Sequence, residues 1–421
     1  MDKFIINGGT KLSGKVKVDG AKNASLALMP AALLANGNSI LKNTPRLRDV
    51  NTMISLLEFL GVETTFTDHV LTLDTGKIKS QNAPYEHVKK MRASVYVLGP
   101  LLAKYGRAKV SLPGGCAWGP RPINLHIEGL KKLGAEIELE EGYIIAKAKK
   151  LVGTEILFEK PSVGATGNIL MAASLAKGTT IINNAAMEPE ITNLSKFLNK
   201  MGARISGINT SKLIIEGVDE LLPATIDTIP DRIEAGTLLI AGAITKGKIE
   251  LQNCNSEHLK ILINKLQESG CNLLVNNDII TLDASDSDIR SIDINTAVYP
   301  GFPTDMQAQW IALMSVASGV ANVTDNIYLD RFNHVPELLR LGASIKMIEN
   351  TAIITGVKKL KGAKVMSTDL RASASLVLAG LIAEGTTEVL RVYHLDRGYQ
   401  LIDEKLKMLG ADIKRVEGSE Y

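Results

Sequence analysis

The sequence predicts an α/β protein of two lobes, each built from three copies of a helix–strand unit. Its 421 residues exceed what one ordinary hydrophobic core holds, which favours several domains. A short phrase centred on Gly, such as KLGAE or KMGAR, closes a helical segment six times, at intervals of about 70 residues. A second kind of helix, rich in Ala, Leu and Gly, precedes most of these phrases. Regularity of this kind indicates internal repeats.

The glycines follow amphipathic segments such as TNLSKFLNKMG and HLKILINKLQESG, where apolar residues recur at helical spacing. Gly at that place predicts a left-handed helix C-terminus. A strand-like run comes next in each copy, so the segment reads as an exposed helix followed by one or two strands. The six glycines are Gly61, Gly134, Gly202, Gly270, Gly342 and Gly410.

The second kind of helix is apolar nearly all round, which predicts burial. Repeats that cannot cover their own apolar faces must pack on one another, either as an open solenoid or as closed lobes. Small residues in the buried helices favour close packing at the centre of a lobe, with the boundary near 221–231. The six segments are 23–35, 92–103, 162–176, 232–244, 305–317 and 370–383.

Composition narrows the function classes. A formal net charge of +3 lacks the basic excess of broad nucleic-acid binding, and no apolar run reaches the roughly 20 residues of a membrane span. The start carries no secretory signal pattern, so we expect a cytoplasmic protein. Three scattered cysteines predict no disulfide framework. Without P-loop, GxGxxG or His/Cys zinc patterns, we expect no metal and no cofactor.

Several stretches, in order, resemble the enolpyruvyl transferase family, and within it the UDP-N-acetylglucosamine 1-carboxyvinyltransferases of peptidoglycan synthesis. The resemblance covers essentially the whole chain. The stretches are VDGAKNASLALMPAALLA, MRASVYVLGPLLA, LPGGCAWGPRPINLHIEGLKKLGAE, SVGAT, NNAAMEPEI, PDRIEAGT, YPGFPTDMQAQ, RFNHVPELLRLGA, DLRASASLVLAGL and DRGY.

The resemblance implies an inside-out α/β barrel of two lobes with the active site in the cleft between them. Residues 22–229 would form the N-terminal lobe. Residues 230–421, completed by the segment 1–21, would form the C-terminal lobe. This crossover of the first segment is not readable from the repeats themselves.

The family's first substrate is phosphoenolpyruvate, a three-carbon trianion that needs several cations around it. Lys22 stands just before an apolar helix, where free N–H groups favour an anion. Any single cation could equally be a solvated charge at a helix end. The resemblance assigns phosphoenolpyruvate to Lys22, Asn23, Arg121, Arg371 and Arg397.

Cys116 lies in LPGGCAWGPRP, where glycines and prolines predict an exposed, shaped loop. An isolated Cys is often a buried small hydrophobe instead, and Cys254 and Cys271 keep that interpretation. In the family, the residue matching Cys116 is a general acid toward the methylene carbon, can form a covalent adduct, and is the target of fosfomycin. Trp118 and Pro120 depart from the family's loop pattern, which leaves fosfomycin sensitivity open.

Asp305 follows GFPT and precedes a buried helix, so one interpretation is that Thr304 or Asp305 is the N-cap of that helix. The resemblance supports another: a base for the sugar's 3-hydroxyl, or a ligand that orients it. The expected catalytic set is Cys116, Asp305, Lys22 and Arg397.

The resemblance also assigns residues to UDP-N-acetylglucosamine. They are Arg92, Arg121, Pro122, Ile123, Asn124, Leu125, Lys160, Pro161, Ser162, Val163, Asp305 and Ile327. Four further residues match positions of the cleft: Glu188, Asp231, Arg331 and Asp369.

The implied reaction is an addition followed by an elimination that releases phosphate. Two alternatives stay open. One is the sister enolpyruvyl transferase that acts on shikimate 3-phosphate, which shares the repeats but lacks the cysteine loop. The other is a scaffold without catalysis.

Overall fold

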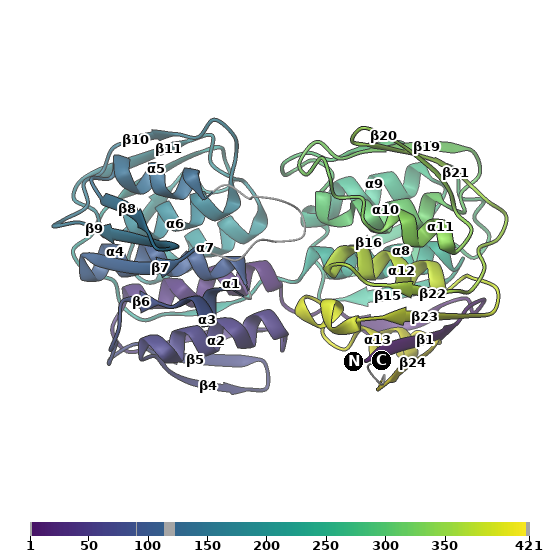
Figure 1. Cartoon of the computed structure of the whole chain (residues 1–421), viewed down its shortest axis with the longest axis horizontal. Coiled ribbons are helices and arrows are strands. Elements are labelled where there is room, and N and C mark those ends of the chain that lie inside the picture. Colours follow the sequence, from purple (N-terminus) through teal and green to yellow (C-terminus); the bar gives the residue numbers. More distant parts are fainter. Residues whose placement is uncertain (1, 90, 113–122, 418–421) are drawn as a thin grey trace. The chain divides into compact units, whose positions relative to one another are not determined.

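The computed structural model describes residues 2–89, 91–112 and 123–417. The chain divides into two compact units (Figure 1). The N-terminal unit comprises residues 20–229, and the C-terminal unit comprises residues 1–19 and 230–421. Each unit has its own hydrophobic core, with no residue shared between the two core clusters. Each unit is therefore described by itself.

The N-terminal unit contains three four-stranded sheets within its described residues, ordered β14-β3-β5-β4, β6-β7-β9-β8 and β10-β11-β13-β12. Its strands are β3 (Asn38–Lys42), β4 (Glu63–Thr67), β5 (Val70–Asp74), β6 (Asn82–Ala83), β7 (Arg107–Ser111), β8 (Glu136–Glu140), β9 (Tyr143–Lys147), β10 (Glu155–Leu157), β11 (Thr179–Asn183), β12 (Arg204–Ser206), β13 (Lys212–Glu216) and β14 (Thr225–Asp227). Its helices are α1 (Lys22–Ala31), η1 (Ala32–Leu34), α2 (Arg48–Leu60), α3 (Tyr85–Val88), η2 (Arg92–Val97), α4 (Leu98–Tyr105), α5 (Asn124–Lys132), α6 (Val163–Ala173) and α7 (Pro189–Lys200).

The C-terminal unit repeats this plan in its described residues, with sheets ordered β2-β15-β17-β16, β18-β19-β21-β20 and β22-β23-β1-β24. Its strands are β1 (Lys3–Asn7), β2 (Ser13–Lys17), β15 (Lys248–Gln252), β16 (Asn272–Asn276), β17 (Ile279–Asp283), β18 (Ile294–Asn295), β19 (Val320–Thr324), β20 (Ser344–Ile348), β21 (Thr351–Thr355), β22 (Lys364–Met366), β23 (Thr386–Leu390) and β24 (Asp412–Val416). Its helices are α8 (Arg232–Ile244), η3 (Ser256–Leu259), α9 (Lys260–Glu268), η4 (Thr304–Met306), α10 (Gln307–Met314), α11 (Val335–Arg340), α12 (Leu370–Gly380), η5 (Val392–Arg397) and α13 (Ile402–Met408).

One strand pattern serves all six sheets. A short strand pairs in parallel with the next strand of its sheet, as β10 does with β11 across α6. An antiparallel pair then completes the sheet: β12 and β13 form a hairpin, whereas β24 pairs with β1 from the N-terminal segment. Where the two parallel strands follow each other in the chain, as β10 and β11 do, a buried helix makes the crossover between them. The mixed α/β class built from three repeats per lobe is confirmed.

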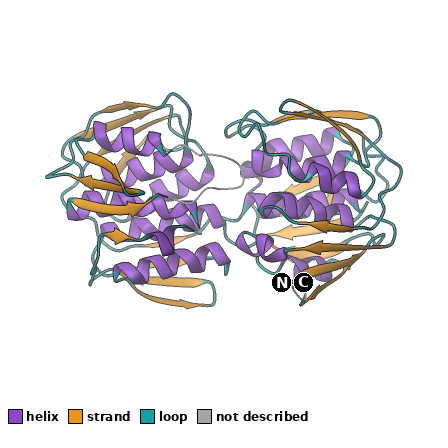
Figure 2. Ribbon diagram, viewed as in Figure 1, coloured by secondary structure: helices purple, strands orange, loops and turns teal. Residues whose placement is uncertain are grey.

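Within each unit the helices lie inside and the strands lie around them (Figure 2). Helix α10 is buried along its whole length and contacts both α8 and α12. Small residues permit this close approach: a Cβ placed on Gly236 of α8 would lie 2.9 Å from the side chain of Met306, directly before α10. The predicted burial of the Ala- and Leu-rich helices is thus confirmed here.

The six repeat glycines adopt the left-handed conformation that the sequence predicts. Gly61, for example, has φ of 107° and caps α2. Residues with a Cβ rarely adopt this conformation, so glycine ends each amphipathic helix and turns the chain into the following strand.

The N-terminal segment supplies two strands to the C-terminal unit. Strand β1 pairs with β23 and β24, and β2 pairs in parallel with β15. The chain then enters the N-terminal unit at Gly20, where an added Cβ would lie 1.7 Å from the Asn43 carbonyl oxygen. Only glycine fits this close backbone approach.

Candidate active site

Asp305 lies in η4, at the start of the buried helix α10. Arg331 Nη1 donates a hydrogen bond to Oδ1 of Asp305 at 2.8 Å, and Arg371 Nη2 donates to Oδ2 at 2.8 Å. Neither η4 nor α10 carries a side-chain cap, so the N-cap reading of Asp305 is wrong. The carboxylate instead joins two guanidinium groups from distant parts of the sequence.

The two arginines set the charge of this group. Burial alone would raise the pKa of the Asp305 carboxyl, but the charges of Arg371 and Arg331 outweigh burial and hold that pKa well below its usual range. Burial alone would lower the pKa of the Arg371 guanidinium. The negative charge of Asp305 outweighs burial, so this pKa is raised. Asp305 is therefore a carboxylate at neutral pH, and its side chain remains 26% exposed.

Arg371 also packs against an aromatic ring. Its guanidinium carbon lies 5.4 Å from the centre of the Tyr399 ring, a cation–π distance. The Tyr399 hydroxyl lies 2.9 Å from Thr237 Oγ1 and accepts a hydrogen bond from Gln309 Nε2 at 3.2 Å. The α12 helix that carries Arg371 contacts η5, which ends at the half-buried Arg397. Two of the predicted phosphoenolpyruvate ligands thus come from neighbouring elements of one unit.

Lys22 is the first residue of α1, in the N-terminal unit. Its Nζ lies 3.4 Å from Asp49 Oδ2, and the two side chains are 12% and 5% exposed. The ammonium group is thus held near the helix N-terminus, where the helix dipole also favours anions. Asn23 is exposed beside it.

Three segments predicted to bind the nucleotide sugar come together within the N-terminal unit. Tyr96, four residues after Arg92 in η2, donates a hydrogen bond from its hydroxyl to the Val163 carbonyl at 3.3 Å. His126, next to Leu125 in α5, faces Gly164 in the first turn of α6: a Cβ on Gly164 would lie 2.9 Å from His126 Nε2. Residues near 92, 125 and 163 therefore share one region of this unit.

The protonation of His126 follows from its contacts. Asn168 Oδ1 accepts from the Gly99 N–H at 2.7 Å, which leaves the Asn168 amide to donate to His126 Nδ1 at 2.9 Å. Burial and the nearby Arg92 lower the pKa of His126 to about 4, so the ring is neutral with its proton on Nε2. His126 therefore presents a donor toward the beginning of α6.

The four further residues that the resemblance assigns to the cleft have different local roles. Asp231 caps α8 by accepting from the N–H groups of residues 233 and 234, and Asp369 caps α12 in the same way. Arg331 belongs to the Asp305 cluster. Glu188 precedes α7; burial, the charge of Glu190 and then that of Glu188 raise the pKa of Tyr96.

The remaining predicted ligands are spread along both units. In the N-terminal unit, Lys160 is exposed, Ile123 and Pro161 are half-buried, and Asn124 begins α5. Ser162 caps α6 by accepting from the Ala165 N–H at 3.3 Å. In the C-terminal unit, Ile327 is half-buried in the turn after β19.

Cys116, Arg121 and Pro122 lie outside the described residues. The other two cysteines are buried, as the sequence predicts. Burial, with the charge of Glu234, raises the pKa of the Cys254 thiol to about 12, so this sulfur stays a thiol.

Sequence reasoning missed two buried polar clusters. In one, Lys405 Nζ lies 2.8 Å from Asp19 Oδ2 and forms an ion pair with Glu234. The other is centred on Asp325, whose carboxylate receives two hydroxyls and two backbone N–H groups. The TDN sequence at 324–326 signals a turn, but no sequence signal reveals these long-range partners.

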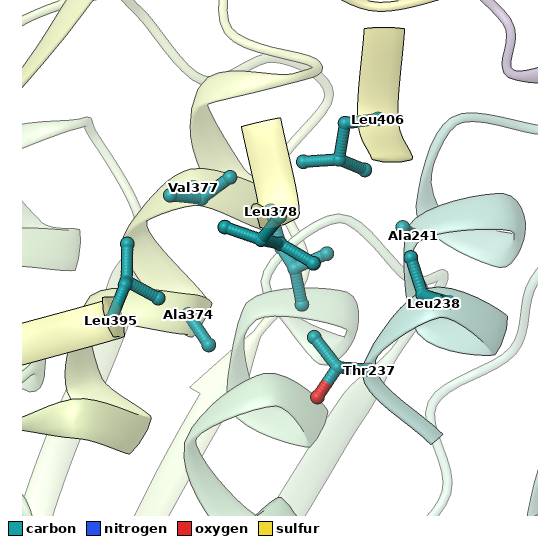
Figure 3. Close-up of a pocket in the computed structure, with 9 residues that line it drawn as sticks. Thr237, Leu238, Ala241, Ala374, Val377, Leu378, Leu395 and Leu406 are labelled. Carbon is teal, nitrogen blue, oxygen red and sulfur yellow. The ribbon is translucent and has the colours of Figure 1, made fainter. Parts of the chain in front are cut away.

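A small cavity lies among α8, α12, η5 and α13. It measures about 10 Å³, room for about one water molecule, and its lining is aliphatic apart from Thr237 (Figure 3). Without converging polar groups, it is a packing void. Within the described ranges, no group of three His, Cys, Asp or Glu side chains could hold a metal, and no helix is long and apolar enough to cross a bilayer.

Known proteins place the chain in a family. Residues 6–406 match the family model described as EPSP synthase (3-phosphoshikimate 1-carboxyvinyltransferase). A UDP-N-acetylglucosamine 1-carboxyvinyltransferase from Chloroherpeton thalassium is 58% identical, with 100% of this chain and 99% of the relative covered. One from Geobacter metallireducens is 55% identical, with 99% of this chain and 100% of the relative covered.

Solved structures agree on the fold. The enolpyruvyl transferase NikO from Streptomyces tendae has a TM-score of 0.91 at 23% identity, with 99% of each chain covered. EPSP synthase from Acinetobacter baumannii has a TM-score of 0.77 at 18% identity, with 99% of this chain and 100% of that chain covered. The full-length identities above 50% show what the fold alone does not, that this chain belongs to the EPSP synthase family and, within it, to the UDP-N-acetylglucosamine 1-carboxyvinyltransferases.

Proposed function

We propose that the chain transfers the enolpyruvyl group of phosphoenolpyruvate to the 3-hydroxyl of UDP-N-acetylglucosamine and releases phosphate. The observation that carries this is the 58% identity, over the whole chain, to a relative named for that transfer. The reaction would be the first committed step of peptidoglycan synthesis, and hence of cell-wall growth and division, in the cytoplasm.

The chemistry proceeds in two steps. A proton is added to the methylene carbon of phosphoenolpyruvate while the sugar hydroxyl attacks C2 and loses its proton, giving a tetrahedral phospholactoyl intermediate. Loss of a proton from the new methyl group and departure of phosphate then restore the double bond as an enol ether. We assign the first proton donation to Cys116 and the acceptance of the hydroxyl proton to Asp305.

The cations stabilise the charge on the phosphate and carboxylate. We assign this role to Lys22, Arg121, Arg371 and Arg397, with Asn23 beside them. The ion pair of Lys22 with Asp49 supports the assignment, because it holds the ammonium group at the start of α1, where the helix dipole favours an anion.

The ion pair with Arg371 could control whether Asp305 acts as a base. With both arginines bound, the Asp305 carboxylate is too stabilised to accept a proton readily. An arriving anion that draws Arg371 away would remove one of the two guanidinium charges from the carboxylate. The pKa of Asp305 would then rise when the substrate arrives, which matches the base to its task.

We assign the nucleotide sugar to Arg92, residues 121–125 and 160–163, Asp305 and Ile327. The gathering of residues 92, 125 and 163 in one region of the N-terminal unit supports this set. The donor Nε2–H of His126 adds a polar group to the same region.

Phosphate release from phosphoenolpyruvate decides between the alternatives. It should be measured with UDP-N-acetylglucosamine, with shikimate 3-phosphate and with no acceptor. We expect release only with the first. Turnover with the shikimate compound alone would make the chain functionally an EPSP synthase, the name that the family model carries. No turnover with either acceptor would favour a scaffold.

A further inference from the structure

Asp325 is a buried acidic residue directly after β19 that none of the assignments above uses. Its side chain is 0% exposed. Oδ1 accepts from Thr296 Oγ1 at 2.7 Å and from the N–H groups of Ile327 and Tyr328 at 2.9 and 3.0 Å. Oδ2 accepts from Thr304 Oγ1 at 2.6 Å. The carboxylate thus joins the turn at 325–328 to the loop that precedes Asp305.

The Thr304 hydroxyl links Asp325 to Arg331. Because it donates to Asp325, its lone pairs face away from that carboxylate, and one of them accepts from Arg331 Nη1 at 3.1 Å. The same Nη1 donates to Asp305 Oδ1 at 2.8 Å. Four side chains therefore form one connected series: Asp325, Thr304, Arg331 and Asp305.

We propose that Asp325 is a positioning residue for the transfer reaction. It orients the Thr304 hydroxyl so that Arg331 holds the Asp305 carboxylate at a fixed angle, and it shapes the turn that carries Ile327. Asp325 touches no substrate. This inference rests on the proposed function, in which Asp305 meets the sugar hydroxyl and Ile327 lies against the nucleotide sugar.

The chain offers a matched pair of threonines to test this. Thr304 and Thr296 each donate a hydroxyl to Asp325, but Thr304 Oγ1 also accepts from Arg331, whereas Thr296 Oγ1 accepts from the Asn326 N–H at 3.0 Å. Thr304→Val removes the link to Arg331 while keeping the side-chain shape. Thr296→Val removes the other hydroxyl, and its loss of stability should be similar. Thr304→Ser keeps the hydroxyl.

We expect Thr304→Val to lower kcat about ten- to a hundredfold, with a smaller change in either KM, because misplacing a reacting group costs rate more than binding. Thr304→Ser should restore most of kcat. Thr296→Val should lower the thermal midpoint without a comparable loss of kcat. Equal kcat losses in the two Val variants, or no rescue by Ser, would overturn the proposal.

Asp325→Asn closes a double-mutant cycle with Thr304→Val. If Asp325 acts through Thr304, each single variant should lower kcat, and the double variant should lose little more than Asp325→Asn alone. Additive losses would refute the connection. The activity of the wild-type chain separates the two hypotheses. If the wild type is active and the kcat losses of the variants are additive, only the inference is refuted. If the wild type is inactive, the proposed function is refuted, and the inference with it. Thermal unfolding of every variant identifies any that fail to fold.

Discussion

The Arg371 guanidinium holds the Asp305 carboxylate through a 2.8 Å hydrogen bond between residues 66 positions apart. Both side chains belong to the C-terminal unit, and Arg371 is only 4% exposed. A guanidinium carries five N–H donors, so a buried arginine that pairs with one carboxylate can also donate to an anionic substrate. This relationship underlies the first prediction.

Arg371→Lys should lower kcat/KM for phosphoenolpyruvate about ten- to a hundredfold, because an ammonium group lacks the planar fork that binds two oxyanions at once. The KM for UDP-N-acetylglucosamine should change much less. Steady-state kinetics with each substrate varied in turn provide the measurement. Arg340→Lys, at an arginine whose side chain is 59% exposed, is the control. Values within twofold of wild type would contradict a role for Arg371 in anion binding.

Gly164→Ala tests the region where α5 meets α6. The added Cβ would lie 2.9 Å from His126 Nε2, so either the imidazole or the first turn of α6 must move. We expect KM for UDP-N-acetylglucosamine to rise about tenfold, as for a displaced binding group. KM for phosphoenolpyruvate serves as the internal control. If both constants rise together, this region does not belong to the nucleotide-sugar site.

The role of Cys116 as a general acid can be tested by substitution and by its reaction with fosfomycin. Cys116→Ser should abolish or severely reduce turnover, because a hydroxyl is a far weaker acid than a thiol. Cys116→Asp should keep part of the turnover and lose alkylation by fosfomycin, which mass spectrometry detects. Cys254→Ser is the control, since that thiol is buried and its pKa is raised to about 12. Undiminished turnover of the Ser variant would exclude the acid role.

Glu234 should make stability depend on pH. Burial, together with Asp19 and against the opposing charge of Lys405, raises the pKa of Glu234 to about 7. The unfolded value is about 4.3, so between roughly pH 4 and 7 the folded state binds more protons, and stability falls as pH rises through that window. Glu234→Gln removes this slope. The thermal midpoint of Glu234→Gln minus that of wild type should therefore be greater at pH 8 than at pH 5.

Thermal unfolding across that range, with Glu257→Gln as control, provides the measurement. Glu257 is an exposed carboxylate with a side chain 77% exposed, so the same substitution there should leave the slope in place. Parallel curves for wild type and Glu234→Gln would show that another group dominates the pH dependence.

Sequence predicted the features that local chemistry determines. The left-handed turn at Gly61 needs only glycine after an amphipathic helix, and the burial of α10 needs only an apolar segment without a polar face. The partners of Asp305 could not be read in this way. Its hydrogen bonds run to residues 26 and 66 positions away, and nothing in GFPTD distinguishes a capping aspartate from one held by two arginines.

The same limit applies to Asp325. A DN pair after a strand predicts a turn, and the N–H bonds to Ile327 and Tyr328 are those of a turn. Its bond to Thr304 depends on tertiary packing that brings β19 beside η4. Local patterns therefore predict where a polar residue lies along an element, while the fold decides which distant group it meets.

The contribution of β1 to the sheet that ends with β24 imposes an order of events on the growing chain. Lys3 lies opposite Val416, so β1 cannot complete its pairing until β24, which follows the whole N-terminal unit in the sequence, has been synthesised. Every described strand of the N-terminal unit, by contrast, finds its sheet partners within residues 20–229. The N-terminal unit can therefore fold during translation before β24 exists, whereas the C-terminal unit is completed only after β24 has been made.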